Sequence, residues 1–172
     1  RALAKGGLSL ANASIAVGAL LQQTEAAARS LKGAGPLREV LESELGQVRV
    51  RLANIERSTA QGEIDAEKAA LQYRGLVREL ERYRRIVDSA VASVAGAKKG
   101  AATLPRTASE AYEVLGVNAE VSAGVLKKIV DALRMSWHPD HARDAEDRML
   151  REDRIRQINI AWDLISANRE AA

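Results

Sequence analysis

Apolar residues recur at intervals of three and four along most of this chain, which is the period of a helix that buries one face. The clearest run comprises Leu37, Leu41, Leu45, Val48, Leu52 and Ile55. A later run comprises Tyr73, Leu76, Leu80, Tyr83, Val87 and Val94. No stretch alternates between polar and apolar residues as a half-buried strand would. The pattern predicts an all-α fold, with an N-terminal helical hairpin or three-helix unit of coiled-coil character.

Glycines and prolines divide these runs. The nearly apolar run at residues 8–21 is shorter than the ~20 residues of a membrane helix, and it predicts a buried helix. In "KGAGP", Gly33 or Gly35 could take the left-handed conformation that ends this helix. Pro36 suits the first turn of the next helix.

The segment "QGEIDAEKA" has the residues of a tight turn between two helices. Gly62 could end one helix, Asp65 could cap the next, and Ile64 stands where a hydrophobic staple would. We therefore favour a hairpin. The alternative is one long helix for a parallel coiled-coil dimer, with its apolar phase carried through Thr59, Gly62, Ala66 and Ala69. Those four are poor seam residues, and glycine costs ~1 kcal/mol in a helix interior.

Three further helices are predicted near the C-terminus. "SEAYEVLGV" is a short amphipathic helix, with Ser109 as its cap and Gly116 as its stop. A second helix runs from about Ser122 to Trp137 and ends because Pro139 disfavours helical geometry in the preceding residue. After a loop of roughly a dozen residues, the final helix buries a stripe of Ile155, Ile158, Trp162 and Ile165.

Charge is distributed unevenly, with a net +6 in residues 1–107 and −3 in residues 108–172. The change falls at "GAKKGAATLPRT", which is small, polar and typical of a linker. We expect a helical coiled-coil-like region at 1–96, a linker at 97–107 and a second unit at 108–172.

Composition limits the chemistry and the compartment. The chain has no cysteine, which excludes disulfides, thiolate catalysis and cysteine-based zinc modules and permits a reducing compartment. It begins at Arg1 without a signal-peptide pattern. We expect a fragment located in the cytoplasm, or on the cytoplasmic face of a membrane if the missing N-terminal part holds an anchor.

Arg74, Arg78, Arg82 and Arg85 share one helical face. Such a stripe could contact nucleic acid or anionic lipid. We favour a solvated face with local pairs such as Glu81 with Arg85, and expect no nucleic acid partner, because no aromatic residues accompany the arginines.

Both histidines of the chain lie in "MSWHPDHARD". A metal site of His138, Asp140 and His141 would need three side chains of one short turn to aim at one ion. A hydrolase with His138 as its base would need a nucleophile in a pocket, and Ser136 should point elsewhere on its helix. We expect neither, no cofactor, and no phosphate-binding loop.

The C-terminal residues resemble a J-domain, the module by which DnaJ-type cochaperones act on DnaK-type heat-shock ATPases. The opening "AYEVLGV" is similar to the family's "DYYEILGV", "HPD" is its signature tripeptide, and "RIRQINIAWDLIS" is similar to its third-helix "KFKEINEAYEVLS". The resemblance covers residues 108 to about 168. It implies a helical bundle of the class that keeps only the J-domain, here at the C-terminus.

The resemblance also implies a docking function rather than an enzyme. In the family, the second helix and the tripeptide loop contact the ATPase and promote ATP hydrolysis. The corresponding partner-binding residues are His138, Pro139, Asp140, Lys127, Lys128 and Arg134. The N-terminal helices would supply targeting, client selection or self-association.

The second helix departs from the family pattern, because Asp131, Ala132 and Ser136 stand at positions that are often basic. These departures weaken electrostatic steering toward an acidic partner groove. They support the alternative of a helical scaffold whose degenerate J-domain binds a partner without stimulating its ATPase.

Overall fold

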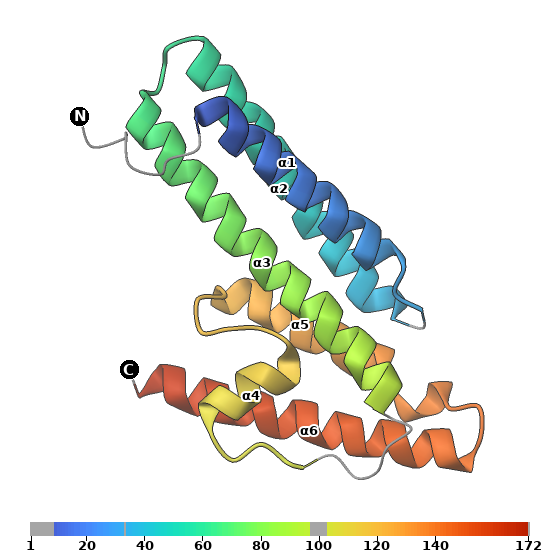
Figure 1. The fold of residues 1–172 in the computed structure, drawn as a ribbon. Helices are drawn as coiled ribbons and strands as arrows, with labels where there is room; N and C mark the ends of the chain where they lie inside the picture. Colours follow the sequence, from blue (N-terminus) through green and yellow to red (C-terminus); the bar gives the residue numbers. More distant parts are fainter. Residues whose placement is uncertain (1–8, 33, 97–102, 172) are drawn as a thin grey trace.

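The computed structural model describes residues 9–32, 34–96 and 103–171, with side chains of α3 described as far as residue 92. Within these residues the protein is all-α. Its elements are α1 (Leu10–Arg29), α2 (Gly35–Ala60), α3 (Ala66–Gly96), α4 (Ala108–Leu115), α5 (Ala123–Ser136), the 3₁₀ turn η1 (Pro139–His141) and α6 (Ala145–Glu170). Helices α1–α3 lie side by side as long rods, and α4–α6 pack across their lower end (Figure 1). We call these two sets the N-terminal unit and the C-terminal unit.

The N-terminal unit is held by the apolar stripes that the sequence predicts. The stripe of α2 is buried in full. The stripe of α3 is buried from Tyr73 to Val87, and the side chain of Val94 lies outside the described residues. Helix α1 packs against both of its neighbours. The prediction of a buried helix holds for one face of α1, which includes Val17 and Leu21, whereas Ile15 on another face is 70% exposed.

The chain turns back on itself between α2 and α3, as the hairpin prediction requires. Gly62 has a φ of +71°, a left-handed conformation that glycine adopts without steric cost. Asp65 Oδ1 accepts a hydrogen bond from the backbone N–H of Lys68 at 2.8 Å and so caps α3. Ile64 packs against the core. The alternative of one continuous helix is therefore wrong.

The turn between α1 and α2 differs from its prediction. Helix α1 ends at Arg29, and Ser30 caps it in a right-handed conformation. Gly35 does not adopt a positive φ and instead begins α2, with Pro36 in the first turn as expected. Gly33 lies outside the described residues. Because Ser30 ends α1 in a right-handed conformation, this helix end does not require a left-handed glycine.

The C-terminal unit keeps its predicted helices but not all of their boundaries. Gly116 ends α4, as predicted, with a φ of +71°, and the Ser122 hydroxyl caps α5 close to the predicted start of that helix. Thr107, rather than Ser109, caps α4 by accepting from the N–H of Glu110. Both hydroxyl residues suit a cap, and the choice depends on which one precedes the first helical residue.

Helix α6 begins several residues earlier than the sequence predicted, so the expected loop of a dozen residues was too long. Asp144 caps the helix by accepting from the N–H of Asp147 at 2.8 Å. The acidic side chains of Glu146 and Asp147 then lie in the first turn, where the helix dipole favours them. The early start places the N-terminal part of α6 beside the turn η1.

The two units pack tightly against each other. Helix α5 lies against α2, and α4 lies against α3. The left-handed turn at Gly116 is so close to α3 that a Cβ there would lie 2.5 Å from the Cβ of Ser89. Arg82 of α3 also forms an ion pair with Glu120, at 3.4 Å. The buried residues of both units form one continuous apolar cluster.

Candidate functional site

The tripeptide His138, Pro139 and Asp140 forms a tight exposed turn at the C-terminal end of α5. Its His138 Nδ1 accepts a hydrogen bond from the backbone N–H of Asp140 at 3.2 Å. The side chains of His138 and Asp140 are 53% and 80% exposed. Since Nδ1 is an acceptor, neutral His138 carries its proton on Nε2, which is then free to meet a partner. The turn thus presents an imidazole N–H and a carboxylate to solvent.

This turn is held in place by α6. Arg151 Nη1 donates to the carbonyl of Ser136 at 3.0 Å, and its guanidinium lies over the ring of Trp137, 5.9 Å from the centroid. Asp147 pairs with Arg151 at 3.2 Å. The N–H of Arg143, together with Arg151, lowers the pKa of Asp147 below its ordinary value. A rigid support of this kind reduces the entropy lost when the turn meets a partner.

The three basic residues predicted for the site lie on α5 but do not form one patch. Lys127 and Arg134 share the open side of the helix, with Asp131 between them. Lys127 Nζ lies 2.8 Å from Asp131 Oδ2, and Arg134 lies 3.7 Å from Asp131 Oδ1. Arg134 also donates to Asn159 of α6 at 2.9 Å. Lys128 lies on the side of α5 that meets α2.

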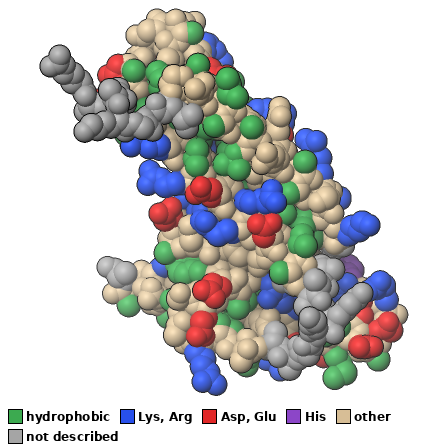
Figure 2. All heavy atoms as spheres, in the orientation of Figure 1, with side chains coloured by type: hydrophobic (Ala, Val, Ile, Leu, Met, Phe, Trp, Pro, Cys, Tyr) green, Lys and Arg blue, Asp and Glu red, His purple; other side chains and the backbone are tan. Residues whose placement is uncertain are grey.

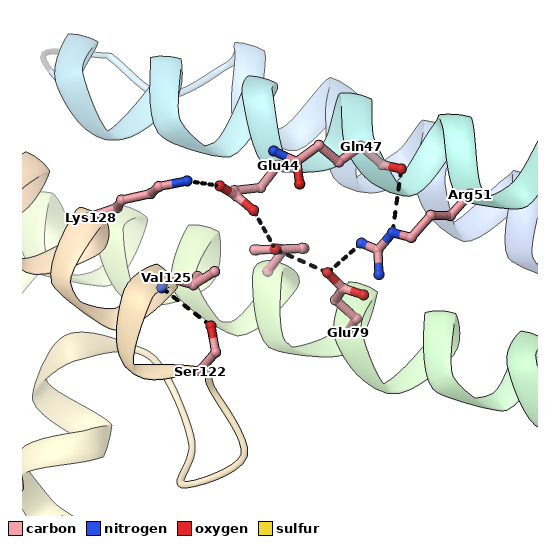
Figure 3. A network of polar contacts seen from close by, with 8 residues as sticks. Glu44, Gln47, Arg51, Glu79, Ser122, Val125 and Lys128 are labelled. Carbon is pink, nitrogen blue, oxygen red and sulfur yellow. Dashed lines mark hydrogen bonds and ion pairs between the residues drawn. The ribbon is translucent and has the colours of Figure 1, made fainter.

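The sequence analysis did not identify one further residue of this site, Glu44 of α2. Its side chain is 5% exposed, and Lys128 Nζ donates to its Oε1 at 2.8 Å (Figure 3). The hydroxyl of Tyr83 lies between Glu44 and Glu79, at 3.4 and 3.2 Å, and its single proton can serve either carboxylate. Burial and the neighbouring negative charges raise the pKa of Tyr83, which keeps this proton on the hydroxyl.

A signal for Glu44 was present in the heptad pattern. It lies three residues after Leu41 and four before Val48, in the same apolar stripe of α2. A glutamate at a core-facing position must find a partner or else lose the free energy of its hydration. Arg51 supports the other end of the same network, 2.7 Å from Glu79 (Figure 3).

The geometry gives no support to the metal and hydrolase alternatives. Among residues 9–32, 34–96 and 103–171, no three histidine or acidic side chains are grouped to hold a metal ion. Ser136 is buried while His138 is exposed, so the hydroxyl does not share the solvent-facing site of the imidazole. Ser136 instead lines a cleft of about 790 Å³ between the units, together with Leu37, Leu133 and Trp137.

One arginine of the stripe on α3, Arg82, forms an ion pair that the sequence did not predict. Arg74, Arg78 and Arg85 are exposed, whereas Arg82 is half-buried and pairs with the C-terminal unit. The expected pair of Glu81 with Arg85 is not formed within the described part of the chain. Basic and acidic side chains are interspersed on the face shown in Figure 2, as on an ordinary solvated surface.

Comparisons with known proteins assign no family to this chain: no family model matches it, and no solved structure matches it. None of the helices in the described residues has the length and apolar character needed to cross a membrane.

Proposed function

We propose that the C-terminal unit is a J-domain that docks on a DnaK-type heat-shock ATPase and stimulates its ATP hydrolysis. The observation that carries this proposal is the exposed, braced turn of His138, Pro139 and Asp140 at the end of α5. Within the described residues, its two polar side chains make one local hydrogen bond and a contact of 3.5 Å with each other, and the His138 ring lies 6.1 Å from the ring of His141. They contribute little to the fold and are available to a partner.

Each residue of the turn would have a distinct part in docking. The Asp140 carboxylate can accept charged hydrogen bonds from a lysine or arginine of the ATPase, which are among the stronger contacts at an interface. The Nε2–H of His138 can donate to a backbone or side-chain oxygen. Pro139 restricts the backbone, so that the two side chains are presented in one geometry. Lys127, Lys128 and Arg134 would supply attraction to an acidic groove.

The protein would then regulate another enzyme and carry out no reaction of its own. Docking would change the conformational equilibrium of the ATPase, and the binding free energy of the turn would favour its hydrolytic state. The N-terminal unit would serve targeting, client selection or self-association. A cytoplasmic location, where DnaK-type chaperones and reduced proteins occur together, is part of this proposal.

The test is a steady-state ATPase assay of a DnaK-type chaperone with the full chain. We expect His138→Gln and Asp140→Asn each to abolish stimulation. Circular dichroism and melting should stay close to wild type, because exposed substitutions usually alter stability by less than ~0.5 kcal/mol. His141→Gln is the matched control, since His141 is exposed in the same turn and should keep full stimulation. Retained stimulation in both test variants would refute the mechanism.

One observation favours a second candidate, a scaffold that binds a partner without stimulating its ATPase. All three basic side chains of α5 are paired with carboxylates of the same protein. Little net positive charge is then left on α5 to attract an acidic groove of a partner. A partner that co-purifies with the chain through His138 and Asp140, while its ATPase rate stays at the basal value, would support the scaffold.

A further inference from the structure

Besides the apolar face that it buries in the core, helix α5 has two further sides. One side is open and carries Lys127, Asp131, Arg134 and, just beyond the helix, His138, at steps of four, three and four. The other side carries Lys128, Ala132 and Ser136 at steps of four. The proposed docking site includes residues from both sides. On the first side the charged side chains are all at least partly exposed, whereas on the second side Lys128 is 57% exposed but Ala132 and Ser136 are buried.

The second side of α5 faces the N-terminal unit. At one end Lys128 bonds to Glu44 of α2, and at the other end Ser136 shares a cleft with Leu37 of α2. Ala132, which lies between them along the helix, is 4% exposed, and α5 as a whole packs against α2. A large partner approaching α5 from this side would collide with α2.

The N-terminal unit also neutralises the one basic group on this side. Lys127 and Arg134 are paired with Asp131 of their own helix, whereas Lys128 is paired with a carboxylate from outside the C-terminal unit. Among the described residues, this is the only side-chain hydrogen bond between α2 and α5. Glu44 therefore forms with Lys128 the kind of ion pair that an acidic group of a partner would form.

The chemistry of Glu44 makes this contact reversible. The carboxylate is buried in the closed arrangement, and the loss of its hydration offsets much of what the ion pair gains. When α5 moves away, the Glu44 carboxylate regains water, whereas Lys128, whose side chain is already 57% exposed, exchanges this partner for solvent. The ion pair itself therefore contributes little to the free energy that holds α5 against α2, which suits a contact that a competing partner displaces.

We propose that α2 is an intramolecular brake on docking, in which Glu44 competes with the acidic groove of the chaperone for Lys128 and α2 covers the Ala132 side of α5. The proposal rests on the proposed function, since it assigns regulation to the same site. The closed form presents only the exposed turn and the open side of α5. The open form presents the whole helix and binds more tightly, and the apparent affinity is reduced by the fraction of closed molecules.

The decisive variant is Glu44→Gln in the full chain. Glutamine keeps the shape and an acceptor for Tyr83 but removes the charge that holds Lys128. The concentration needed for half-maximal ATPase stimulation should fall about five-fold or more, at the lower end of allosteric coupling, with the maximal rate unchanged. Amide hydrogen exchange should rise in α5 and in the facing part of α2, and stay unchanged in α1.

Glu25→Gln is the matched control. Glu25 is a buried carboxylate of the same unit, 8% exposed, and pairs with Arg49 rather than with the C-terminal unit. It should leave stimulation at the wild-type concentration. Glu44→Gln with Lys128→Gln should lose the gain, because the released group is then absent. If Glu44→Gln does not fold, Glu44→Asp is the substitute, because its shorter side chain holds the carboxylate away from Lys128. It should also lower the concentration needed for half-maximal stimulation, by a smaller factor.

The outcomes separate the brake from the proposed function. If the wild-type chain stimulates the ATPase through His138, and Glu44→Gln needs the same or a higher concentration, the brake is refuted and the function stands. If wild type and every Glu44 variant fail to stimulate any DnaK-type ATPase tested, the proposed function fails and the brake fails with it.

Discussion

The close packing of the two units can be measured at Gly116. Gly116 and Gly62 have the same φ of +71°, but their surroundings differ. A Cβ at Gly62 meets nothing within 4 Å, whereas a Cβ at Gly116 would lie 2.5 Å from Ser89 Cβ and 3.1 Å from the Cα of Ile86. Alanine at Gly62 therefore reports backbone strain alone. Alanine at Gly116 reports the same strain together with the contact between α4 and α3.

The two costs can be estimated separately. A left-handed conformation costs a residue with a Cβ roughly 1–2 kcal/mol. Inserting a methyl group into a well-packed site costs typically about 1–3 kcal/mol. We therefore expect Gly62→Ala to lower the free energy of unfolding by roughly 1–2 kcal/mol, and Gly116→Ala by roughly 2–5 kcal/mol. Urea titrations of the full chain, followed by circular dichroism and extrapolated to water, measure both values.

A double variant tests whether the excess comes from the contact between the units. Ser89→Gly removes the Cβ that the new methyl group would meet, so it should recover part of the cost of Gly116→Ala in a double-mutant cycle. Ser89→Ala keeps that Cβ and removes only the hydroxyl oxygen, which would lie 3.0 Å from the new methyl group, so it should recover less. Equal losses for Gly62→Ala and Gly116→Ala, or equal behaviour of the two Ser89 variants, would contradict the tight packing of α4 on α3.

Two further predictions concern carboxylates of the C-terminal unit. Asp131→Lys removes the group that pairs with Lys127 and Arg134, so association with a DnaK-type chaperone should become several-fold faster at low ionic strength and much less so at high; weaker binding would instead show that Asp131 contacts a basic group of a dedicated partner. Asp147 has a lowered pKa because of the N–H of Arg143 and the charge of Arg151, so it stabilises the fold above its unfolded-state pKa and loses this effect as the pH falls through its folded-state pKa. Melting curves of Asp147→Asn should therefore show a lower midpoint than wild type near neutral pH and the same midpoint in strong acid.

The helices and most of their ends could be predicted because local rules act there. The apolar stripes of α2 and α3 have helical spacing, and both are buried where side chains are described. Gly62 is left-handed, Asp65 caps α3 and Gly116 ends α4, at the places where the sequence indicated them. Such features depend on a few neighbouring residues, which a sequence displays directly.

Contacts between distant segments were harder to predict. Nothing local identifies Glu120 as the partner of Arg82, which the sequence placed on a solvated face. The start of α6 was misplaced because its polar first turns carry no apolar stripe, and the cap at Asp144 marks it instead. The sequence correctly placed the end of α5 just before Pro139, but the support that Arg151 gives to the turn of His138 to Asp140 depends on the tertiary fold.

Packing also changes the meaning of the departures from the family pattern in α5. Ala132 and Ser136 are buried, so a lysine or arginine at either position would have to bury its charge. Their identity is thus explained by a second packed side of the helix and says little about attraction to a partner. Asp131 is different, because it lies on the open side and pairs with both basic residues there. Of the three departures, it is the one that alters the charge a docking partner would meet, so the electrostatic strength of this site depends on Asp131 and on Glu44.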